Sequence, residues 1–311
     1  MKKIFIVIVL VIMYVFVFGS ESEKKLKGPY LGQKNPGMKS EIFVPGFVST
    51  KYNELNSVFT KDGQEMYFSQ RGVPGKRSSI LYTKMMDNVW IKPESVGFFR
   101  GKYSVVDLFI TDDNEKMIFC SNKPFKGDKE KKDHDFWITE RKNNSWSKPK
   151  PFAPIVNSSH EDYFPIITGS GNFYFNSQRE GFGTNNIFCA KFKNGKYNVP
   201  VKLEDPINSK YREFDAFISS DETMIIFSSE RPGGSGASDI YVSFKKMDGS
   251  FAEPKNLGKR INSSGWEYGS HLSPDGKFFF YTSTKNGSED IFWISAQIIY
   301  DLNNNKSEQD L

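Results

Sequence analysis

The stretch "SPDGKFFFYTSTKNGSEDIFWIS", residues 273–295, has the composition of a hairpin followed by a further strand. "SPDG" combines the residues that tight turns favour, and an aromatic run follows it. A polar loop then leads to a second apolar run, which Asp290 opens. Alternating turn and strand signals of this kind are typical of an antiparallel sheet.

The aromatic strand of this stretch recurs along the chain. Its five copies are "EMYFSQR" (65–71), "KMIFCSNK" (116–123), "NFYFNSQR" (172–179), "MIIFSSER" (224–231) and "FFFYTSTK" (278–285). The base that ends each copy recurs every 52 to 56 residues. A first strand and a turn precede each copy, and a third strand such as "DIYVSF" or "DIFWIS" follows it. Repeats of this length with four short strands predict the blades of a β-propeller.

We therefore predict an all-β fold, a five-bladed β-propeller of four-stranded antiparallel blades. The fifth copy lacks a fourth strand, and "EIFVPGFVSTKYNE" (41–54) resembles the fourth strands of the other copies. An N-terminal strand should thus complete the last blade and close the ring, which removes open sheet edges. The predicted parts are a signal peptide (1–19), a linker (20–40), the propeller (41–300) and a disordered tail (301–311).

The N-terminus has the pattern of a secretory signal. Lys2 and Lys3 precede an apolar run that ends at Phe18, and the small residues Gly19 and Ser20 follow. An uncleaved anchor is the alternative, although a run of this length is short for a membrane span. We expect an exported protein, periplasmic, extracellular or at the cell surface, with no membrane span in the mature chain.

The charge of the chain argues against nucleic acid as a partner. The formal net charge is +5, from 42 basic and 37 acidic residues, and the lysines are scattered rather than gathered in a stripe. The two cysteines, Cys120 and Cys189, each lie within an apolar strand-like run. Buried thiols are the favoured interpretation, and a disulfide between them stays open.

Three motifs carry a family resemblance. "SPDGKFFFYTS", "RPGGSGASDIYVS" and "PKNLGKRINS" resemble the WD-repeat-like propeller repeats of the TolB type, which are common in bacterial periplasmic and surface proteins. The resemblance covers nearly all of the mature chain. It implies an interaction platform without a fixed ligand, and the count of five blades departs from the six that are usual for TolB-type proteins.

Propeller topology indicates where a binding site would lie. The connections between blades and the loops between second and third strands share one face, here the loop face, whereas the opposite turn face carries tight turns. Loops on a rigid scaffold are frequent binding sites. The candidate binding residues on the loop face are the acids that open first strands and the bases that end second strands: Glu54, Asp162, Glu213, Glu267, Arg71, Arg179 and Arg231. A role in fixing loops is the competing interpretation of these repeated charges.

Two carboxylates depart from the repeat. Asp107 and Asp215 occupy the third position of the first strand, where the other copies have Asn56, Phe164 and Gly269. Paired carboxylates near a channel mouth can act as acid and base in glycoside hydrolysis.

The three histidines, His134, His160 and His271, fall in different repeats, and we predict no metal site and no cofactor. The preferred function is a non-catalytic platform that binds a protein, a peptide or a cell-envelope glycan. The alternative is a glycoside hydrolase or lyase that uses Asp107 and Asp215.

Overall fold

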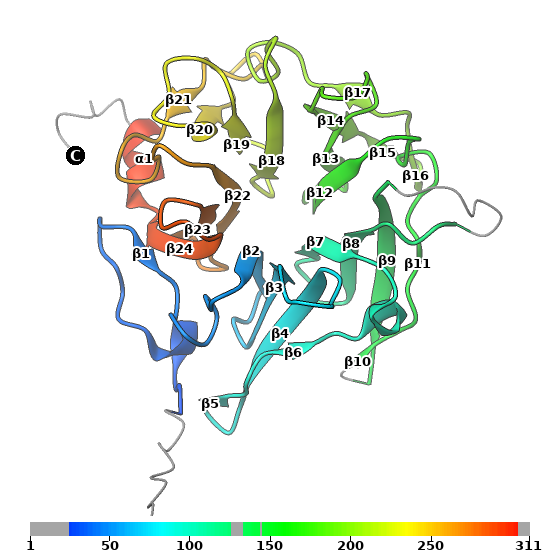
Figure 1. Ribbon diagram of the computed structural model, residues 1–311. Coiled ribbons are helices and arrows are strands. Elements are labelled where there is room, and N and C mark those ends of the chain that lie inside the picture. The colour runs from blue at the N-terminus through cyan, green and yellow to red at the C-terminus, as the bar shows by residue number, and fades with distance from the viewer. Residues whose placement is uncertain (1–24, 126–132, 144, 304–311) are drawn as a thin grey trace, which may run out of the picture.

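The protein is a ring of small sheets. The computed structural model describes residues 25–125, 133–143 and 145–303, and these residues form five antiparallel sheets of four or five strands around a central axis (Figure 1). The predicted five-bladed propeller is confirmed. The predicted signal peptide and residues 304–311 of the predicted tail lie outside the described residues. Among the described helices, none is both long and apolar enough for a membrane span.

Each blade begins with its innermost strand at the axis. Blade 1 contains β2 (Asn53–Phe59), β3 (Glu65–Arg71), β4 (Ser79–Met86), β5 (Val89–Trp90) and β6 (Glu94–Ser95). Blade 2 contains β7 (Val105–Ile110), β8 (Lys116–Ser121), β9 (Asp135–Lys142), β10 (Ser145–Trp146) and β11 (Lys150–Pro151). Blade 3 contains β12 (Asp162–Ile167), β13 (Phe173–Ser177), β14 (Asn186–Ala190) and β17 (Val201–Lys202), with the hairpin of β15 (Phe192–Lys193) and β16 (Lys196–Tyr197). Blade 4 contains β18 (Glu213–Ile218), β19 (Met224–Ser229), β20 (Asp239–Phe244) and β21 (Lys255–Asn256). Blade 5 contains β22 (Glu267–Leu272), β23 (Phe278–Ser283), β24 (Asp290–Ser295) and β1 (Glu41–Ile42).

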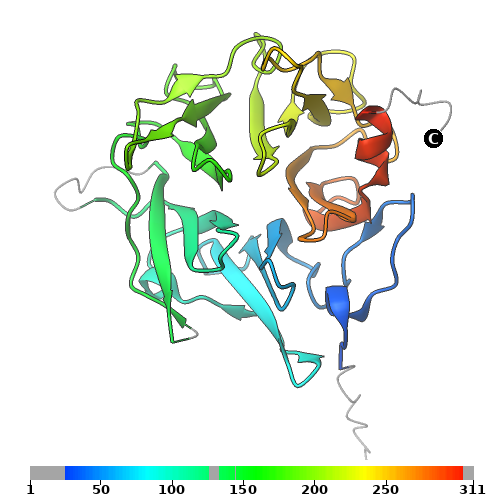
Figure 2. The same ribbon diagram turned by 180° about the vertical axis from the view of Figure 1, so that it is seen from behind.

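The last blade is built from both ends of the chain. Strand β1 pairs antiparallel with β24, so that Glu41 lies opposite Trp293 and Ile42 opposite Phe292. The blue N-terminal segment lies beside the red C-terminal strands in both views of the ring (Figures 1 and 2). The predicted closure of the ring is therefore confirmed.

Aromatic side chains fill the space between blades. Phe43, Phe59, Phe280 and Trp293, from blades 5 and 1, are all buried, and the Phe43 ring centroid lies 5.1 Å from that of Phe280. Such edge-to-face pairs add to the free energy gained by burying the rings. A repeated aromatic strand is thus explained by the need of each blade to bury both of its faces against its neighbours.

Two segments outside the blades also pack on the ring. Residues 25–40, expected to be a linker, include the fully buried Leu31, and the backbone carbonyl of Gly28 accepts a 2.8 Å hydrogen bond from the Trp90 indole. Helix α1 (Gln297–Asn303), which the sequence did not predict, buries Ile298 and Leu302 against blades 4 and 5. Three residues of the predicted disordered tail are therefore helical.

The motif "NS" at the end of a unit ties neighbouring strands together. The side-chain oxygens of Asn157, Asn208 and Asn262 each accept a 2.8 Å hydrogen bond from a backbone N–H at the start of the third strand. The next residue, a serine in each of these units, donates its backbone N–H to the acid that opens the following blade. The repeated polar residues therefore fix the connections on the loop face.

Candidate functional site

Every innermost strand carries a β-bulge near its start, at the third residue of β7, β12, β18 and β22 and at the fourth residue of β2. The backbone of this residue is left-handed in all five blades, with φ between +45° and +66°, and the strand pairing shifts register there. The five residues are Asn56, Asp107, Phe164, Asp215 and Gly269. Asn, Asp and Gly tolerate this conformation better than other residues. In blade 1 the bulged Asn56 directs its side-chain amide to Asp107 of the neighbouring blade.

Hydrogen bonds between blades hold the bulges in place. The backbone N–H of Asp107 donates to the Ser69 hydroxyl at 3.1 Å, and that of Asp215 donates to the Asn176 side-chain oxygen at 3.2 Å. Asn56 makes the equivalent bond to Thr282 of blade 5 at 3.2 Å. Each acceptor belongs to the second strand of the preceding blade. The ring of bulges is therefore a rigid platform at the axis.

Asp107 and Asp215 lie on this platform and are almost completely buried, with 6% and 8% of their surfaces exposed. The Asn56 amide donates a hydrogen bond to the Asp107 carboxylate. Burial raises the pKa of Asp107 to about 6, although hydrogen bonds from Asn56 and the Phe164 backbone oppose the shift. Burial and the neighbouring charge of Asp107 raise the pKa of Asp215 well above its ordinary value. The structure thus brings the two predicted carboxylates into electrostatic contact.

This environment favours different protonation states for two chemically identical groups. The raised pKa favours the protonated form of Asp215, whereas Asp107, with the Asn56 amide as a donor and a pKa of about 6, is the more readily ionised of the two. A buried pair of this type can supply a proton with one member and accept a proton or attack carbon with the other. Acid–base chemistry at the axis is therefore within the reach of the two groups.

The raised pKa of Asp107 predicts how the free energy of unfolding depends on pH. Between about pH 4 and pH 6 the folded state binds more protons than the unfolded state, so the stability of the fold falls as the pH rises through this window. The substitution Asp107→Asn removes the penalty. We expect its free energy of unfolding to exceed that of the wild type by up to about 3 kcal/mol above pH 6 and to approach it at pH 4.

Urea unfolding at pH 4, 5, 6 and 7 measures this difference. The control is Asp113→Asn on the turn face, because the Thr111 hydroxyl lowers the pKa of Asp113 and its removal should give no gain in stability above pH 6. If the free energies of unfolding of Asp107→Asn and the wild type differ by the same amount at every pH, the raised pKa of Asp107 is contradicted.

A histidine with a fixed orientation lies beside Asp107. The Nδ1 atom of His134 lies 2.9 Å from the Glu161 carboxylate and 2.9 Å from the Tyr163 hydroxyl. Among the described residues, its buried Nε2 atom has no hydrogen-bond partner. The charge of a protonated His134 would lower the pKa of Asp107. The sequence named His134, but Glu161 and Tyr163 were missed because they flank the repeated acid Asp162 without recurring themselves.

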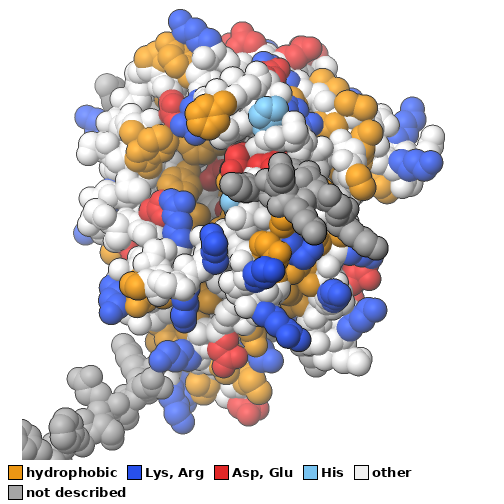
Figure 3. Space-filling view, turned by 45° about the vertical axis from the view of Figure 1, so that its right-hand side comes forward, with side chains coloured by type: hydrophobic (Ala, Val, Ile, Leu, Met, Phe, Trp, Pro, Cys, Tyr) orange, Lys and Arg blue, Asp and Glu red, His pale blue; other side chains and the backbone are white. Residues whose placement is uncertain are grey.

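A second polar network lies near both carboxylates. The Arg71 guanidinium forms an ion pair with Glu289 between blades 1 and 5, and the Tyr268 hydroxyl donates to Glu289 at 2.5 Å. The positive charge of Arg71 lowers the pKa of both Asp107 and Asp215. Glu289 and Tyr268 were not singled out from sequence. In the space-filling view, acidic side chains lie in a depression near the middle of the surface, with basic side chains close by (Figure 3).

The repeated acids that open first strands are buried. Glu54, Asp162, Glu213 and Glu267 each have 0% exposure. Glu213, for example, accepts hydrogen bonds from the backbone and hydroxyl of Ser209 and from the Ser229 hydroxyl. Contacts of this kind hold the loops that enter each blade, which is the competing interpretation given to these acids.

The repeated bases differ in their partners. Arg179 and Arg231 reach the acid of their own blade, at 3.1 Å from Asp162 and 3.4 Å from Glu213. In blade 1, Glu54 lies opposite Gln70, which donates to it at 2.8 Å. Arg71 is therefore one position out of register with the other bases, and this offset directs it to Glu289 instead of Glu54.

The described residues form neither a disulfide between the two cysteines nor a cluster of metal ligands. Cys120 and Cys189 are free and buried, and burial raises the pKa of both thiols. Within the described residues, no group of three or more His, Cys, Asp or Glu side chains is arranged to hold a metal ion.

Comparisons with known proteins find similar folds among solved structures. No family model matches the sequence, and no curated protein matches it. The structure is similar to that of an endo-arabinase from Bacteroides thetaiotaomicron, with a TM-score of 0.51 and 13% identity over 84% of this chain and 97% of that chain. It is also similar to a thermostable family-43 glycoside hydrolase, with a TM-score of 0.50 and 12% identity over 80% of this chain and 90% of that chain. At these identities the likeness shows the fold alone.

These findings correct two sequence-based expectations. The resemblance to TolB-type repeats has no support beyond the propeller fold, because no family model matches. The prediction of a non-catalytic interaction platform is contradicted, because the two solved structures named above are an endo-arabinase and a glycoside hydrolase, both of them enzymes.

Proposed function

We propose that this chain is an exported carbohydrate-active enzyme that cleaves glycosidic bonds at the axis of the propeller, on the loop face. The observation that carries the proposal is the buried pair of Asp107 and Asp215, in electrostatic contact and with raised pKa values. The endo-arabinase and the family-43 hydrolase support it as enzymes of this class built on the same fold. A cell-envelope or plant glycan is the proposed substrate class.

The two carboxylates take different roles in this proposal. Asp215, whose raised pKa favours its protonated form, donates this proton to the oxygen of the leaving sugar as the glycosidic bond breaks. Asp107 ionises and either removes a proton from the attacking water or attacks the anomeric carbon itself. The positive charge that develops on the sugar ring is stabilised by the Asp107 carboxylate in both cases.

Aromatic side chains lie near the carboxylates, and Trp266 and the half-buried Tyr163 offer surfaces for sugar rings, whereas Phe214 and Tyr268 are buried. Tyr163 and Tyr268 precede the bulges of blades 3 and 5, and Phe214 precedes that of blade 4. Trp266 is 38% exposed, and its ring centroid lies 6.4 Å from that of Phe214. The apolar faces of sugars pack well against such rings, whereas the hydroxyl groups need the nearby charged side chains.

The test is a screen of the purified protein on oligosaccharides, followed by a pH profile on any substrate that it cleaves. We expect kcat/KM to rise as the pH passes about 6, because Asp107 must lose its proton, and to fall again where Asp215 ionises. Activity that does not change between pH 4 and pH 8 would contradict the assignment of these two groups.

A further inference from the structure

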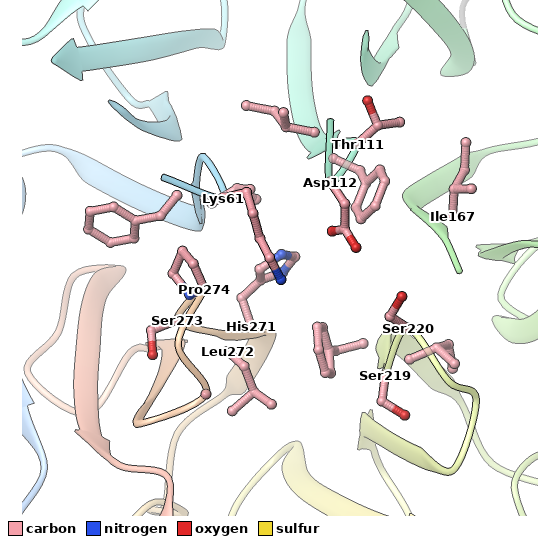
Figure 4. A pocket seen from close by; sticks show the side chains of 17 residues that line it. Lys61, Thr111, Asp112, Ile167, Ser219, Ser220, His271, Leu272, Ser273 and Pro274 are labelled. Atoms are coloured by element: carbon pink, nitrogen blue, oxygen red, sulfur yellow. The ribbon is translucent and has the colours of Figure 1, made fainter. Parts of the chain in front are cut away.

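A separate pocket opens on the turn face. It has a volume of about 250 Å³ and is lined by residues from the ends of first strands and by the turns that follow them. Figure 4 shows these residues arranged around the axis, with the side chains of Lys61, Asp112 and His271 directed toward the middle of the pocket. Asp107 and Asp215 do not line it. The sequence had left this face without a site, because only tight turns were expected there.

The wall of the pocket departs from the repeat at one residue. Two positions after each bulge, the first strands of blades 1 to 4 carry an apolar residue: Val58, Phe109, Ile166 and Phe217. Blade 5 carries His271 at this position. Its side chain is 9% exposed, and burial lowers its pKa to about 4, so the imidazole is neutral at pH 7. A hydrogen bond with the backbone of Ser270 opposes this shift and offsets part of the cost of placing a polar ring at this position of the wall.

The rim carries two unlike charges. Lys61 and Asp112 occupy the same turn position in blades 1 and 2, and no described residue forms an ion pair with either side chain. The Lys61 turn is fixed, because its backbone N–H donates to the Asn114 side chain at 3.0 Å. The neighbouring Asp113 is engaged by the Thr111 hydroxyl at 2.5 Å, whereas Asp112 stays available. A cation and an anion thus face one small cavity from separate blades.

We propose that this pocket binds a free α-amino acid with an apolar side chain. The ammonium group of the ligand would pair with Asp112, and its carboxylate would pair with Lys61 and accept a hydrogen bond from the imidazole of His271. The apolar side chain would pack on Val58, Phe109 and Phe217, which line the same pocket. Charge-assisted hydrogen bonds to both ends of a zwitterion make this ligand class a better match than a neutral sugar. The inference is independent of the proposed hydrolase activity.

Calorimetric titration of the full chain with leucine tests the proposal. N-acetyl-leucine and leucine amide, each lacking one charge, and a neutral monosaccharide complete the series. We expect leucine to bind and each of the other three to bind at least about tenfold more weakly. The variants Lys61→Met and Asp112→Asn should each lower the affinity for leucine about tenfold, whereas Lys246→Met, on an exposed turn, should leave it unchanged.

The variant His271→Phe provides a second measurement, because it places the aromatic residue of blades 2 and 4 in the same wall position. It should weaken leucine binding and raise the melting temperature of the free protein. The proposal is overturned if leucine does not bind, if the monosaccharide binds as tightly, or if the rim variants bind leucine as the wild type does. These experiments measure leucine binding and not hydrolase activity. Failure of the amino-acid site and failure of the proposed hydrolase function can therefore be told apart.

Discussion

Replacing Asp215 by asparagine is expected to lower kcat for a natural glycan by about 10³-fold, because the variant cannot donate a proton to the leaving oxygen. Replacing Asp107 by asparagine should cause a loss of similar size, because the amide neither accepts a proton nor attacks carbon. Both substitutions preserve the shape of the side chain and its acceptor oxygen, so the ring of bulges should persist. Steady-state kinetics on the substrate found by screening measures both effects.

An aryl glycoside with a good leaving group separates the two roles. Such a substrate needs no proton on its leaving oxygen, so Asp215→Asn should recover much of its activity on it, whereas Asp107→Asn should not. The control Asp113→Asn, an exposed carboxylate of a blade 2 turn, should retain wild-type activity. Full activity of both Asp107→Asn and Asp215→Asn would remove the basis of the proposed function.

Replacing Gly269 by alanine is expected to destabilise the propeller by about 3 to 5 kcal/mol, which combines backbone strain with overpacking. The added Cβ atom would overlap the Asn56 side-chain oxygen and lie 3.1 Å from the Thr282 hydroxyl, at a φ of +66°. Asn56 has little freedom to retreat, because its amide is bonded to Asp107. Thermal unfolding should show a melting temperature lower by on the order of 10 °C.

A matched variant separates the two causes of this loss. Gly63 has nearly the same backbone conformation, with φ of +67°, but an added Cβ atom there would meet nothing within 4 Å. Gly63→Ala should therefore show only the cost of the left-handed backbone, about 1 kcal/mol. Equal losses for the two variants would mean that the contact with Asn56 does not constrain the axis.

The architecture could be predicted because each repeat has the same order of strands and turns and must bury both faces of its sheet against its neighbours. Turn residues, an aromatic strand and an acid recur at fixed spacing, and the missing strand of the last unit has its counterpart at residues 41–54. The segment at 25–40 and helix α1 could not be predicted in this way. Each occurs once, and what orders it is contact with the completed ring rather than a local pattern.

The site was harder to predict because it depends on bulges and register. The bulge residue of each first strand is left-handed, and although four of the five are Asn, Asp or Gly, these types also fill the turns and Phe164 departs from them, so composition alone does not locate the bulge. A shift of one residue reverses the facing of a strand side chain. Arg71 shows the effect: its charge groups it with Arg179 and Arg231, but it stands one residue after Gln70, the partner of Glu54, whereas those two bases stand two residues after the partner of their acid. Departures from the repeat nevertheless identified Asp107 and Asp215.

The pairing of β1 with β24 also determines the order in which the molecule can be completed. Glu41 leaves the ribosome early, but its partner Trp293 is synthesised about 250 residues later. Until then blade 1 lacks blade 5, one of its two neighbours, and the hydrogen-bonding groups of Ile42 have no strand to pair with. Contacts between residues so distant in sequence form slowly. An interrupted chain would expose an unpaired edge, on which a second unfinished copy could dock as a swapped strand.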